Sequence, residues 1–519
     1  SSEKDINKLL ETILTAAKTI TNADGGTLYR VFDDQLKFEI VLNDTLNIAM
    51  GGTTGNEVPF YPIPLHQADG AENTTMVAAY AVLRDETVNI ADAYTADGFD
   101  FSGTRNFDKK TGYRSMSFLT IPMKNHDGEI IGVLQLLNAQ SNDGKVMPFT
   151  VEDQRLAESL ASQAAIALTN RMLITQLEML FESLIELINT AIDEKSPYTG
   201  GHCKRVPTLT MMLAEAASDA NEGPLASFRM TEKDRYELKI AGLLHDCGKI
   251  TTPVHVVDKA TKLETIFDRI HLVSERFEIL KRDAEIALLN ARLSARAQGD
   301  IAAEHVAERD YQTRIQQLED DRVFLRRTNI GGERMSAEDQ ARVEAIAGYR
   351  IRNEAGVEIP FLSADEKSNL NVPYGTLNPA ERKIINHHIE ATINMLEALP
   401  WPKHLKNVPE YAGGHHERMD GKGYPRGLRR EQMSVQARTM GIADIFEALT
   451  AKDRPYKPGK TLSESLEILG NFKQNGHIDP DLFDVFVRKK IYLKYAELFL
   501  DPEQRDQVDI AKIPGYAGA

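Results

Sequence analysis

The sequence predicts a multidomain protein. An α/β domain with an antiparallel sheet and helices precedes a long connecting helix and an all-α region with a helical insertion. Three observations predict this class. The chain has 519 residues, which is more than one hydrophobic core normally organises. Paired strand patterns lie within the first 150 residues. Helical periodicity dominates from Leu156 onward.

The composition is that of a globular protein with an acidic balance. Hydrophobic residues make up 42% and charged residues 27% of the chain, and the net charge is −16. Such a chain lacks a broad electrostatic footprint for nucleic acid, so we expect no direct DNA binding. A polyanionic substrate would need a locally positive site, which a metal centre could supply.

The cysteine count and the hydropathy pattern bear on location. Cys203 and Cys247 are too few for a disulfide framework, which fits a reducing compartment, so we expect a cytoplasmic protein. No apolar run approaches the roughly 20 residues that span a bilayer, so we expect no membrane span. The chain begins at Ser1 rather than Met, which is consistent with processing, and upstream segments could be missing.

The N-terminal region combines one helix with two hairpins. Apolar residues recur at helical spacing before a Gly25-Gly26 break, at Ile6, Leu9, Leu10, Ile13, Leu14 and Ala17. The strand patterns TLYRVF and LKFEIVL flank Asp33-Asp34-Gln35, and FLTIPM and IIGVLQLLN flank a turn at Asp127-Gly128. Both pairs predict antiparallel strands.

Three segments of this region resemble a GAF domain, a small α/β sensory module: ADGGTLYRV, FDKKTGYRSMSFLTIPM and HDGEIIGVLQLLN. The resemblance covers roughly residues 5–170, and we assign residues 1–155 to the sensory domain. GAF domains that bind cyclic nucleotides carry Asn-Lys, Phe and Asp-Glu. The corresponding positions here are Asn138-Ala139, Phe149 and Asp153-Gln154, so two of five differ. Another small ligand, or none, fits equally well, and the ligand stays open.

A heptad pattern follows from residue 156 to 192. Ten positions step alternately by four and three residues, at Leu156, Leu160, Gln163, Ala167, Asn170, Ile174, Leu177, Phe181, Leu184 and Ile188. Polar Gln163 and Asn170 could set the register of a parallel dimer. We therefore predict a signalling helix that forms a parallel homodimer and joins sensor to effector. The alternative is a helix buried against its own domains.

Histidines and acidic residues recur in apolar surroundings along the rest of the chain. They lie in the segments SPYTGGHCKRV, IAGLLHDCGKI, IINHHIEATI, GGHHERMDGKGYPRGL and ARTMGIADIFEALT. Burying a histidine beside a carboxylate is costly unless the pair is neutralised or binds a metal. Imidazole nitrogens and carboxylate oxygens together suit Fe, Mn or Zn. The pattern therefore predicts a metal site.

The segments HDCGK, HHERMDGKGYP and ADIFEALTAKDRPYK resemble the HD-GYP family of bacterial cyclic dinucleotide phosphodiesterases. The resemblance covers residues 185–270 and 376–500. It implies a phosphodiesterase that hydrolyses cyclic di-GMP to pGpG or GMP by a metal-bridging hydroxide, under regulation by the GAF domain. Two alternatives stay open: a scaffold that binds signalling proteins through its Gly-Tyr-Pro surface, or an enzyme for another cyclic dinucleotide such as cyclic GMP-AMP.

The same resemblance implies two divalent metal ions, with Fe or Mn expected. The first ion would be held by His202, His245, Asp246 and Asp444, and the second by Asp246, His388, His415 and His416. His388 fits the family spacing better than His387, which we expect at the surface. Some members hold a third ion through a glutamate where this chain has Tyr198, so we expect no third metal.

The resemblance also implies residues that contact the substrate. Lys249 would stabilise the phosphate oxygens beside Asp246, and we assign both to catalysis. Arg454 and Lys457 would grip the phosphate and guanine. In the Gly-Tyr-Pro loop, Gly423 and Tyr424 would shape the nucleotide site. The alternative is that this loop is purely structural and positions the histidines before it.

We assign residues 193–500 to the catalytic domain and residues 501–519 to a tail. One departure from the family is an insertion in this domain at about residues 271–377. The apolar residues of the insertion recur at helical spacing, at Ile279, Ile286, Leu289, Leu293, Ile315, Leu318 and Leu325. A helical hairpin broken near Gly299-Asp300 is predicted, followed by another short helix. A partner or dimer surface, a lid over the metals and a solvated structural insert all fit this pattern.

Overall fold

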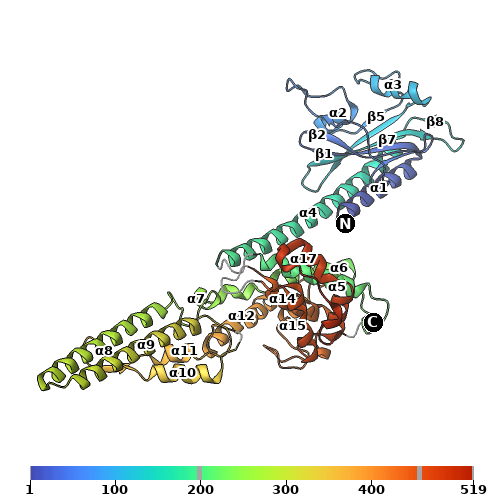
Figure 1. The fold of residues 1–519 in the computed structure, drawn as a ribbon. Coiled ribbons are helices and arrows are strands. Elements are labelled where there is room, and N and C mark those ends of the chain that lie inside the picture. Colours follow the sequence, from blue (N-terminus) through green and yellow to red (C-terminus); the bar gives the residue numbers. More distant parts are fainter. Residues whose placement is uncertain (1, 196–200, 333, 453–458, 517–519) are drawn as a thin grey trace. The chain divides into compact units, whose positions relative to one another are not determined.

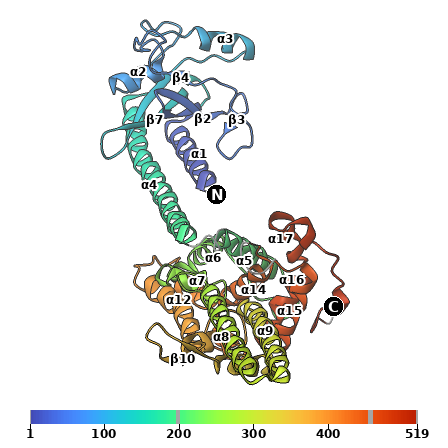
Figure 2. The ribbon, with the colours of Figure 1, turned by 60° about the vertical axis from the view of Figure 1, so that its left-hand side comes forward.

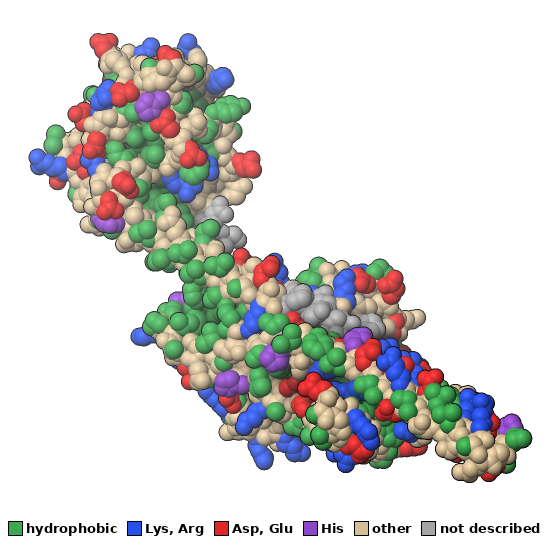
Figure 3. Space-filling model, turned by 90° about the vertical axis from the view of Figure 1, so that its left-hand side faces the viewer, with side chains coloured by type: hydrophobic (Ala, Val, Ile, Leu, Met, Phe, Trp, Pro, Cys, Tyr) green, Lys and Arg blue, Asp and Glu red, His purple; other side chains and the backbone are tan. Residues whose placement is uncertain are grey.

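The computed structural model describes residues 2–195, 201–332, 334–452 and 459–516 (Figure 1). The chain divides into two compact units, Ser1–Phe181 and Glu182–Ala519. Three of the residues discussed above, Tyr198, Arg454 and Lys457, lie outside the described residues. No helix in the described ranges is both long enough and apolar enough to cross a membrane. Acidic and basic side chains are interspersed on the face shown in Figure 3.

The first unit is built on one antiparallel sheet in the order β3-β2-β1-β7-β6-β5, with β4 paired to β2 and β8 to β7. Both predicted hairpins are present, as β1–β2 and β6–β7. The elements are α1 Ser2–Thr21, β1 Ala23–Phe32, β2 Gln35–Asn43, β3 Ile48–Gly51, β4 Ile63–Pro64, α2 Val77–Arg84, β5 Val88–Ile90, α3 Ser102–Thr111, β6 Phe118–Lys124, β7 Ile130–Gln140, β8 Val146–Met147 and α4 Val151–Lys195.

The two faces of this sheet bury alternate residues of each strand, as the two-residue period of a strand requires. Helices α1 and α4 lie side by side against one face, where Leu14 and Ala161 pack with Leu28 of β1 (Figures 1 and 2). The neighbouring residue Tyr29 faces the opposite side and packs with Ala78 of α2. The hydrophobic core therefore has two layers, one on each side of the sheet.

Helix α4 is amphipathic in its first half. Its small residues Ala157, Ala161 and Ala165 are buried in the core of the first unit. The predicted heptad seam lies mainly on the exposed surface, and its large exposed members are Leu156, Ile174, Leu177, Leu184 and Ile188. Most of the seam is therefore not covered by the chain's own described residues.

The second unit is helical, as predicted. Its elements are α5 His202–Ser218, α6 Glu232–Leu244, η1 Cys247–Thr251, α7 Val254–Val257, α8 Ile270–Gln298, α9 Ile301–Asn329, α10 Ala337–Ala347, β9 Arg350–Arg352, β10 Glu358–Pro360, α11 Ala364–Leu370, α12 Pro379–Glu397, α13 Val408–Gly413, η2 Arg430–Gln432, α14 Val435–Thr450, α15 Leu462–Gln474, α16 Pro480–Arg488, α17 Ile491–Phe499, η3 Pro502–Gln504 and η4 Ile510–Lys512. Phe446 of α14 packs edge-on against Phe486 of α16 and Tyr495 of α17.

Local capping fixes where the central helices begin. Thr231 and Asp234 form a capping box at the start of α6, and Asn378 and Glu381 form another at α12. The Ser434 hydroxyl accepts the Ala437 N–H at the start of α14. These caps satisfy backbone donors that a helix leaves unpaired. They fix the register of three helices that reach the site described below.

The insertion is an antiparallel hairpin of α8 and α9 that breaks at Gly299 and Asp300, as the sequence predicts (Figure 1). Gly299 has φ +72°, a conformation that glycine adopts without strain, and the Asp300 carboxylate caps α9. The predicted short helix follows as α10. The small sheet β9–β10 after α10 was not predicted. Phe277 and Phe361 join the hairpin base to this following segment.

Candidate metal centre

Five helical segments of the second unit bring their polar residues to one place. His202 is the first residue of α5, and His245 and Asp246 directly follow α6. His388 lies within α12, and Asp444 lies within α14. The pair His415 and His416 follows α13. All seven residues that the sequence analysis placed at a metal site therefore converge.

The converging atoms form two groups that could each hold a metal ion. One group is Asp246, His388, His415 and His416, and the other is His202, His245 and Asp444. Within each group, the possible ligand atoms lie within 4.8 Å of one another. The two groups contain the residues of the two predicted ligand sets. Asp246, which was predicted for both sets, falls in the group with His388, His415 and His416.

Asp246 faces both groups with different oxygens. Its Oδ1 is 3.2 Å from Nε2 of His388 and 3.9 Å from Nε2 of His415. Its Oδ2 is 3.0 Å from Nε2 of His202 and 3.4 Å from Nε2 of His245. One carboxylate can therefore contribute an oxygen to each group, which is the position a bridging ligand needs.

Three of the histidines are oriented by backbone carbonyls. The Nδ1–H groups of His245 and His415 donate to Gly242 O at 2.7 Å and Ala412 O at 2.6 Å. Nδ1 of His388 donates in the same way to Ile385 O. With the proton on Nδ1, the lone pair of each Nε2 points into the cluster, which is the tautomer that binds metals.

Two buried atoms of the cluster have no hydrogen-bond partner among the residues that the structure describes. They are Oδ1 of Asp246 and Nε2 of His415. A buried acceptor without a partner costs about 1–3 kcal/mol, and more when it is charged. A cation between these two atoms would remove that cost, so the residues present fit a metal ion.

Burial keeps most of the imidazoles neutral. It lowers the pKa of His245 to about 4 and holds the pKa values of His415 and His416 below the ordinary value. Burial also opposes the charge of Asp246, but Lys249 and His245 hold the pKa of this carboxyl well below its usual range. Neutral imidazoles and an ionised carboxylate are the forms that coordinate metals.

His202 differs because a second carboxylate lies behind it. Its Nδ1–H donates to Oε2 of Glu447 at 2.6 Å, and the other oxygen of Glu447 accepts from Arg205 at 2.7 Å. Burial lowers the pKa of His202, but the charge of Glu447 and the hydrogen bonds to Asp246 and Glu447 together raise it to about 9. Glu447 can accept the same proton when Nε2 of His202 faces a metal, so it orients this ligand.

Sequence reasoning missed Glu447, although a signal was present. Glu447 follows Asp444 by three residues in the apolar helix IADIFEALT, and i and i+3 lie on the same helix face. Its carboxylate is buried and still ionised, since His202 and Arg205 offset burial and lower its pKa to about 2. A second acidic residue on the ligand-bearing face of a buried helix was the available clue.

Lys249 and Gly248 complete the segment after Asp246. The Lys249 ammonium forms an ion pair with Oδ2 of Asp246, at the edge of the cluster. Gly248 packs against α12, where a Cβ atom would lie 2.0 Å from the carbonyl oxygen of His388. The Gly248 N–H donates to the Thr392 hydroxyl at 2.9 Å. This glycine therefore permits the close approach of α12 that brings His388 to Asp246.

The Gly-Tyr-Pro loop folds back on the histidine pair. The Tyr424 ring stacks on His416, with centroids 4.9 Å apart and planes at 19°. A Cβ atom on Gly423 would lie 2.4 Å from the backbone nitrogen of Arg418. The buried Glu417 carboxylate accepts the N–H groups of Arg426 and Leu428 at 2.7 and 2.9 Å. The loop thus supports the histidines, as the structural alternative expected, and also places Tyr424 at the cluster.

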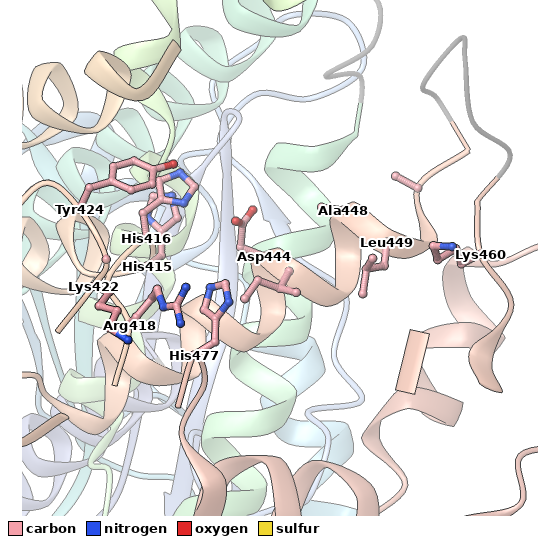
Figure 4. A pocket seen from close by; sticks show the side chains of 13 residues that line it. His415, His416, Arg418, Lys422, Tyr424, Asp444, Ala448, Leu449, Lys460 and His477 are labelled. Atoms are coloured by element: carbon pink, nitrogen blue, oxygen red, sulfur yellow. The ribbon is translucent and has the colours of Figure 1, made fainter. Parts of the chain in front are cut away.

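A cavity of about 540 Å³ opens beside the cluster (Figure 4). Its lining includes the candidate ligands Asp444 and His416 and the ring of Tyr424. Further lining residues carry positive charge or imidazole groups. These are Arg418, Lys422, Lys460 and His477. The sequence analysis missed all four. Arg418 and Lys422 follow His416 by two and six residues, whereas Lys460 and His477 lie just before and just after α15 and reach the cavity only through the packing of that helix.

Arg418 is held in place by a neighbour. Its Nε and Nη2 donate to the two oxygens of Asp420 at 3.1 and 2.9 Å. Burial, followed by the Arg418 charge, lowers the pKa of His477 to about 4, so this imidazole is neutral. His387, by contrast, is exposed and contacts Glu390 at 2.7 Å, as expected for a surface residue.

Comparison with known families divides the chain in the same way as the fold. A model of the GAF domain matches residues 5–168. Two models of the HD domain match residues 199–323 and 354–482. The chain combines a GAF domain with an HD domain. The GAF resemblance inferred from the sequence is confirmed over almost the same residues, and the helical region with the candidate ligands matches the HD domain.

Known relatives of this GAF and HD chain include phosphodiesterases. It is 46% identical over 81 residues to a 3′3′-cGAMP-specific phosphodiesterase 1 of Vibrio cholerae, covering 16% of this chain and 19% of the relative. It is 38% identical over 119 residues to a cyclic di-GMP phosphodiesterase of Pseudomonas aeruginosa, covering 23% and 27%. The matches span less than a third of either relative.

A solved structure of a GAF domain/HD domain protein from Geobacter sulfurreducens is also similar. The likeness has a TM-score of 0.24 and 13% identity, and it covers 33% of this chain and 97% of that structure.

Proposed function

We propose that this chain is a metal-dependent phosphodiesterase that hydrolyses cyclic di-GMP to pGpG, GMP or both. The observation that carries the proposal is the convergence of seven histidine and aspartate residues in two groups around Asp246. A two-ion site of this kind serves phosphodiester hydrolysis because both attacking and leaving oxygens can be stabilised. Fe or Mn suits the mixed imidazole and carboxylate ligands.

When bound, the two ions would supply an activated water and neutralise negative charge on the scissile phosphate. The protein's own residues do the rest. Asp246 and the imidazoles, held by Gly242, Ala412 and Glu447, fix the ligand positions before substrate arrives. Lys249, beside Asp246, places a positive charge where phosphate oxygens would lie.

The cavity beside the cluster supports a nucleotide substrate. Arg418 and Lys422 line its wall and share one carboxylate, Asp420, which leaves a net positive charge there against the net charge of −16 that would repel a dianion. Tyr424 presents an aromatic ring near the cluster, and such rings stack on nucleobases. Arg454 and Lys457 stay proposed contacts to phosphate and guanine.

Cyclic GMP-AMP is the second candidate substrate. A relative named for this activity matches the chain at 46% identity over 81 residues. The two cyclic dinucleotides share their phosphodiester chemistry and differ at one purine, so the choice between them depends on contacts to the base edge. Both substrates therefore belong in the experiment below.

We further propose that the GAF domain regulates the HD domain. A cavity of about 410 Å³ in the GAF domain supports a small ligand there. Its lining is largely aromatic and apolar, with rings from Tyr29, Phe38, Phe60, Phe101, Phe107 and Phe118. Neither lysine nor arginine lines it in the described part of the chain, so a phosphate-bearing ligand would find no cationic partner there.

The test measures metal and turnover on one anaerobically purified sample. Elemental analysis should find close to two transition-metal ions per chain, and cyclic di-GMP should be hydrolysed. His415→Ala should lose metal and most turnover, because it removes a ligand whose Nε2 faces the cluster. His387→Ala is the matched control, since His387 is one residue from His388 but exposed.

Two outcomes would contradict the proposal. One is a protein without bound transition metal and without turnover of either cyclic dinucleotide, with His415→Ala behaving like the parent. The other is equal loss of metal in His415→Ala and His387→Ala, because the effect would then not depend on the cluster. Hydrolysis of cyclic GMP-AMP with no hydrolysis of cyclic di-GMP would support the enzyme and replace its substrate.

A further inference from the structure

The cavity beside the candidate metal centre is lined by two unlike surfaces. One is apolar and is formed by Ile445, Ala448 and Leu449 of α14. The other is basic and carries Arg418 and Lys422 (Figure 4). A nucleotide has the same division, because its base offers flat apolar faces and its phosphates are anionic. The lining therefore provides separate surfaces for the two parts of a nucleotide.

Arg418 is held firmly, but only part of its guanidinium is used. Its Nε and Nη2 each donate one hydrogen bond to Asp420, at 3.1 and 2.9 Å. A guanidinium carries five N–H donors in a planar fork. Neither N–H of Nη1 has an acceptor among the described residues, although the Arg418 side chain is only 30% exposed. The edge of the fork that includes Nη1 is therefore oriented and free to bind an anion.

Backbone hydrogen bonds fix the segment that carries this arginine. The Met419 N–H donates to His477 O at 3.3 Å, and the Asp420 N–H donates to Gly476 O at 2.9 Å. The segment before α16 thus holds the one after the histidine pair in place. Figure 4 shows the side chains of Arg418 and His477 directed toward the same part of the cavity. A group that is fixed before its ligand arrives loses little freedom when the ligand binds.

We propose that Arg418, assisted by Lys422, binds the phosphate of the cyclic dinucleotide that is not being hydrolysed. This inference rests on the proposed function, which places the scissile phosphate at the metal centre. Both phosphates of a cyclic dinucleotide belong to one small ring, so the second must lie close to the first. Arg418 follows the candidate ligand His416 by two residues and lines the same cavity, which places it near enough to take the second phosphate.

The charges of this surface favour a phosphate over a base. Arginine can pair with the edge of a guanine or with two oxygens of a phosphate. The Lys422 ammonium lies 3.7 Å from the same Asp420 carboxylate that holds Arg418. Two basic groups share one carboxylate, so positive charge remains for an anion. A base edge is neutral and gains little from that charge.

The test compares cyclic di-GMP with the linear dinucleotide GpG in the metal-loaded full chain. GpG keeps both guanines and one 3′,5′-phosphodiester but lacks the second phosphate. We measure KM for each, or the inhibition constant of GpG if it is not cleaved. Arg418→Met should raise the ratio of the cyclic di-GMP constant to the GpG constant about tenfold, because only cyclic di-GMP loses a charge-assisted contact.

Lys422→Met is a milder second variant. The Lys422 side chain is 78% exposed, so its replacement should not disturb the fold. The same ratio should rise by a smaller factor, about threefold, because an exposed charge is screened by solvent. If Arg418→Met does not fold, the ratio in Lys422→Met decides.

Arg426→Met is the matched control. Arg426 lies in the same loop and, like Arg418, donates to a carboxylate, that of Glu397 at 2.7 Å, but it does not line the cavity. This variant should leave the ratio unchanged. Equal losses for cyclic di-GMP and GpG in Arg418→Met would overturn the proposal, because the arginine would then bind a base or support the loop. So would a ratio that rises as much in Arg426→Met, or one that stays unchanged in both Arg418→Met and Lys422→Met.

Failure of the proposed function gives a different result. A metal-loaded parent that hydrolyses neither dinucleotide contradicts that function. Equilibrium dialysis of the same sample then measures both dissociation constants without interference from turnover. Arg418→Met should weaken the binding of cyclic di-GMP about tenfold more than that of GpG. A parent that does not bind cyclic di-GMP more tightly than GpG would overturn the second phosphate site.

Discussion

The buried carboxylate of Glu447 acts on the cluster through His202, with which it shares a 2.6 Å hydrogen bond. Glu447→Gln would keep the shape but lose the charge that pairs with His202 and Arg205. We expect metal affinity to fall by about 10–100-fold, the usual effect of losing a carboxylate behind a metal-binding histidine. Competition with a chelator of known affinity measures this change.

Glu497→Gln is the matched control, because Glu497 is exposed on α17. If Glu447→Gln retained the parent's metal affinity, Glu447 would not orient His202. If both variants lost metal equally, the effect would come from overall charge.

Gly248 shows how one missing side chain sets the distance between two helices. In Gly248→Ala the new Cβ would lie 2.0 Å from His388 O and 2.6 Å from the Thr392 nitrogen, both backbone atoms. We expect the free energy of unfolding to fall by about 1–3 kcal/mol, because α12 must move away. Chemical denaturation measures the fall, and metal content should fall with it.

Gly332→Ala tests whether any glycine replacement has this effect. A Cβ at Gly332 meets no atom of the described residues within 4 Å, so this variant should keep both stability and metal. Unchanged stability in Gly248→Ala would mean that the contact between α12 and the segment after Asp246 is looser than described.

The candidate ligand residues were predictable from the sequence, but not every residue that positions them was. His245, Asp246 and His415 stand in short segments whose residue types point to a metal. Gly248 matters only because α12, about 140 residues later in the chain, packs against it. Glu447 gave a local signal through its spacing from Asp444. When the role of a residue depends on an element far away in the sequence, as for Gly248 and α12, the spacing of nearby residues does not predict that role.

At the scale of elements, Lys262 lies where the insertion joins the HD domain. It is buried, and its ammonium donates to Leu370 O at 3.0 Å. Burial lowers the pKa of Lys262 to about 8. Between pH 8 and about 10.5 the unfolded chain therefore binds more protons than the folded one, so stability rises with pH through this window.

Lys262→Met should remove the cost of burying this charge. We expect the variant to be more stable than the parent at pH 7, by about 1–2 kcal/mol after the lost hydrogen bond is subtracted. The difference should shrink as the pH rises from 7 to 9.5, because the parent's lysine becomes neutral. Urea denaturation at both pH values measures it, with exposed Lys489→Met as the control.

A stability difference that is independent of pH would indicate ordinary repacking at this position. A variant less stable than the parent at both pH values would show that the bond to Leu370 outweighs the cost of burial.

Elements formed by neighbouring residues were predicted well. The hairpins β1–β2 and β6–β7 and the break at Gly299 follow from local alternation and turn residues. The order of the sheet was not predicted, since β1 pairs with β7 across about 100 residues. The strands β9 and β10 have three residues each, too few for a period to appear.

At the scale of the whole molecule, the exposed heptad seam of α4 needs a partner. Its members Ile174, Leu177 and Leu184 are exposed, and the sequence predicts a parallel homodimer along this seam. In such a dimer each copy presents the same seam to the other, so these side chains are covered.

Light scattering on the full chain tests this contact. We expect the parent to form dimers as concentration rises. Leu177→Lys should be a monomer, because a buried lysine opposes the contact. Met179→Lys is the control, since Met179 is as exposed as Leu177 but lies off the seam and should leave the dimer intact. A parent that is monomeric at all concentrations would contradict the contact. A Leu177→Lys variant as large as the parent would show that some other surface holds the chains together.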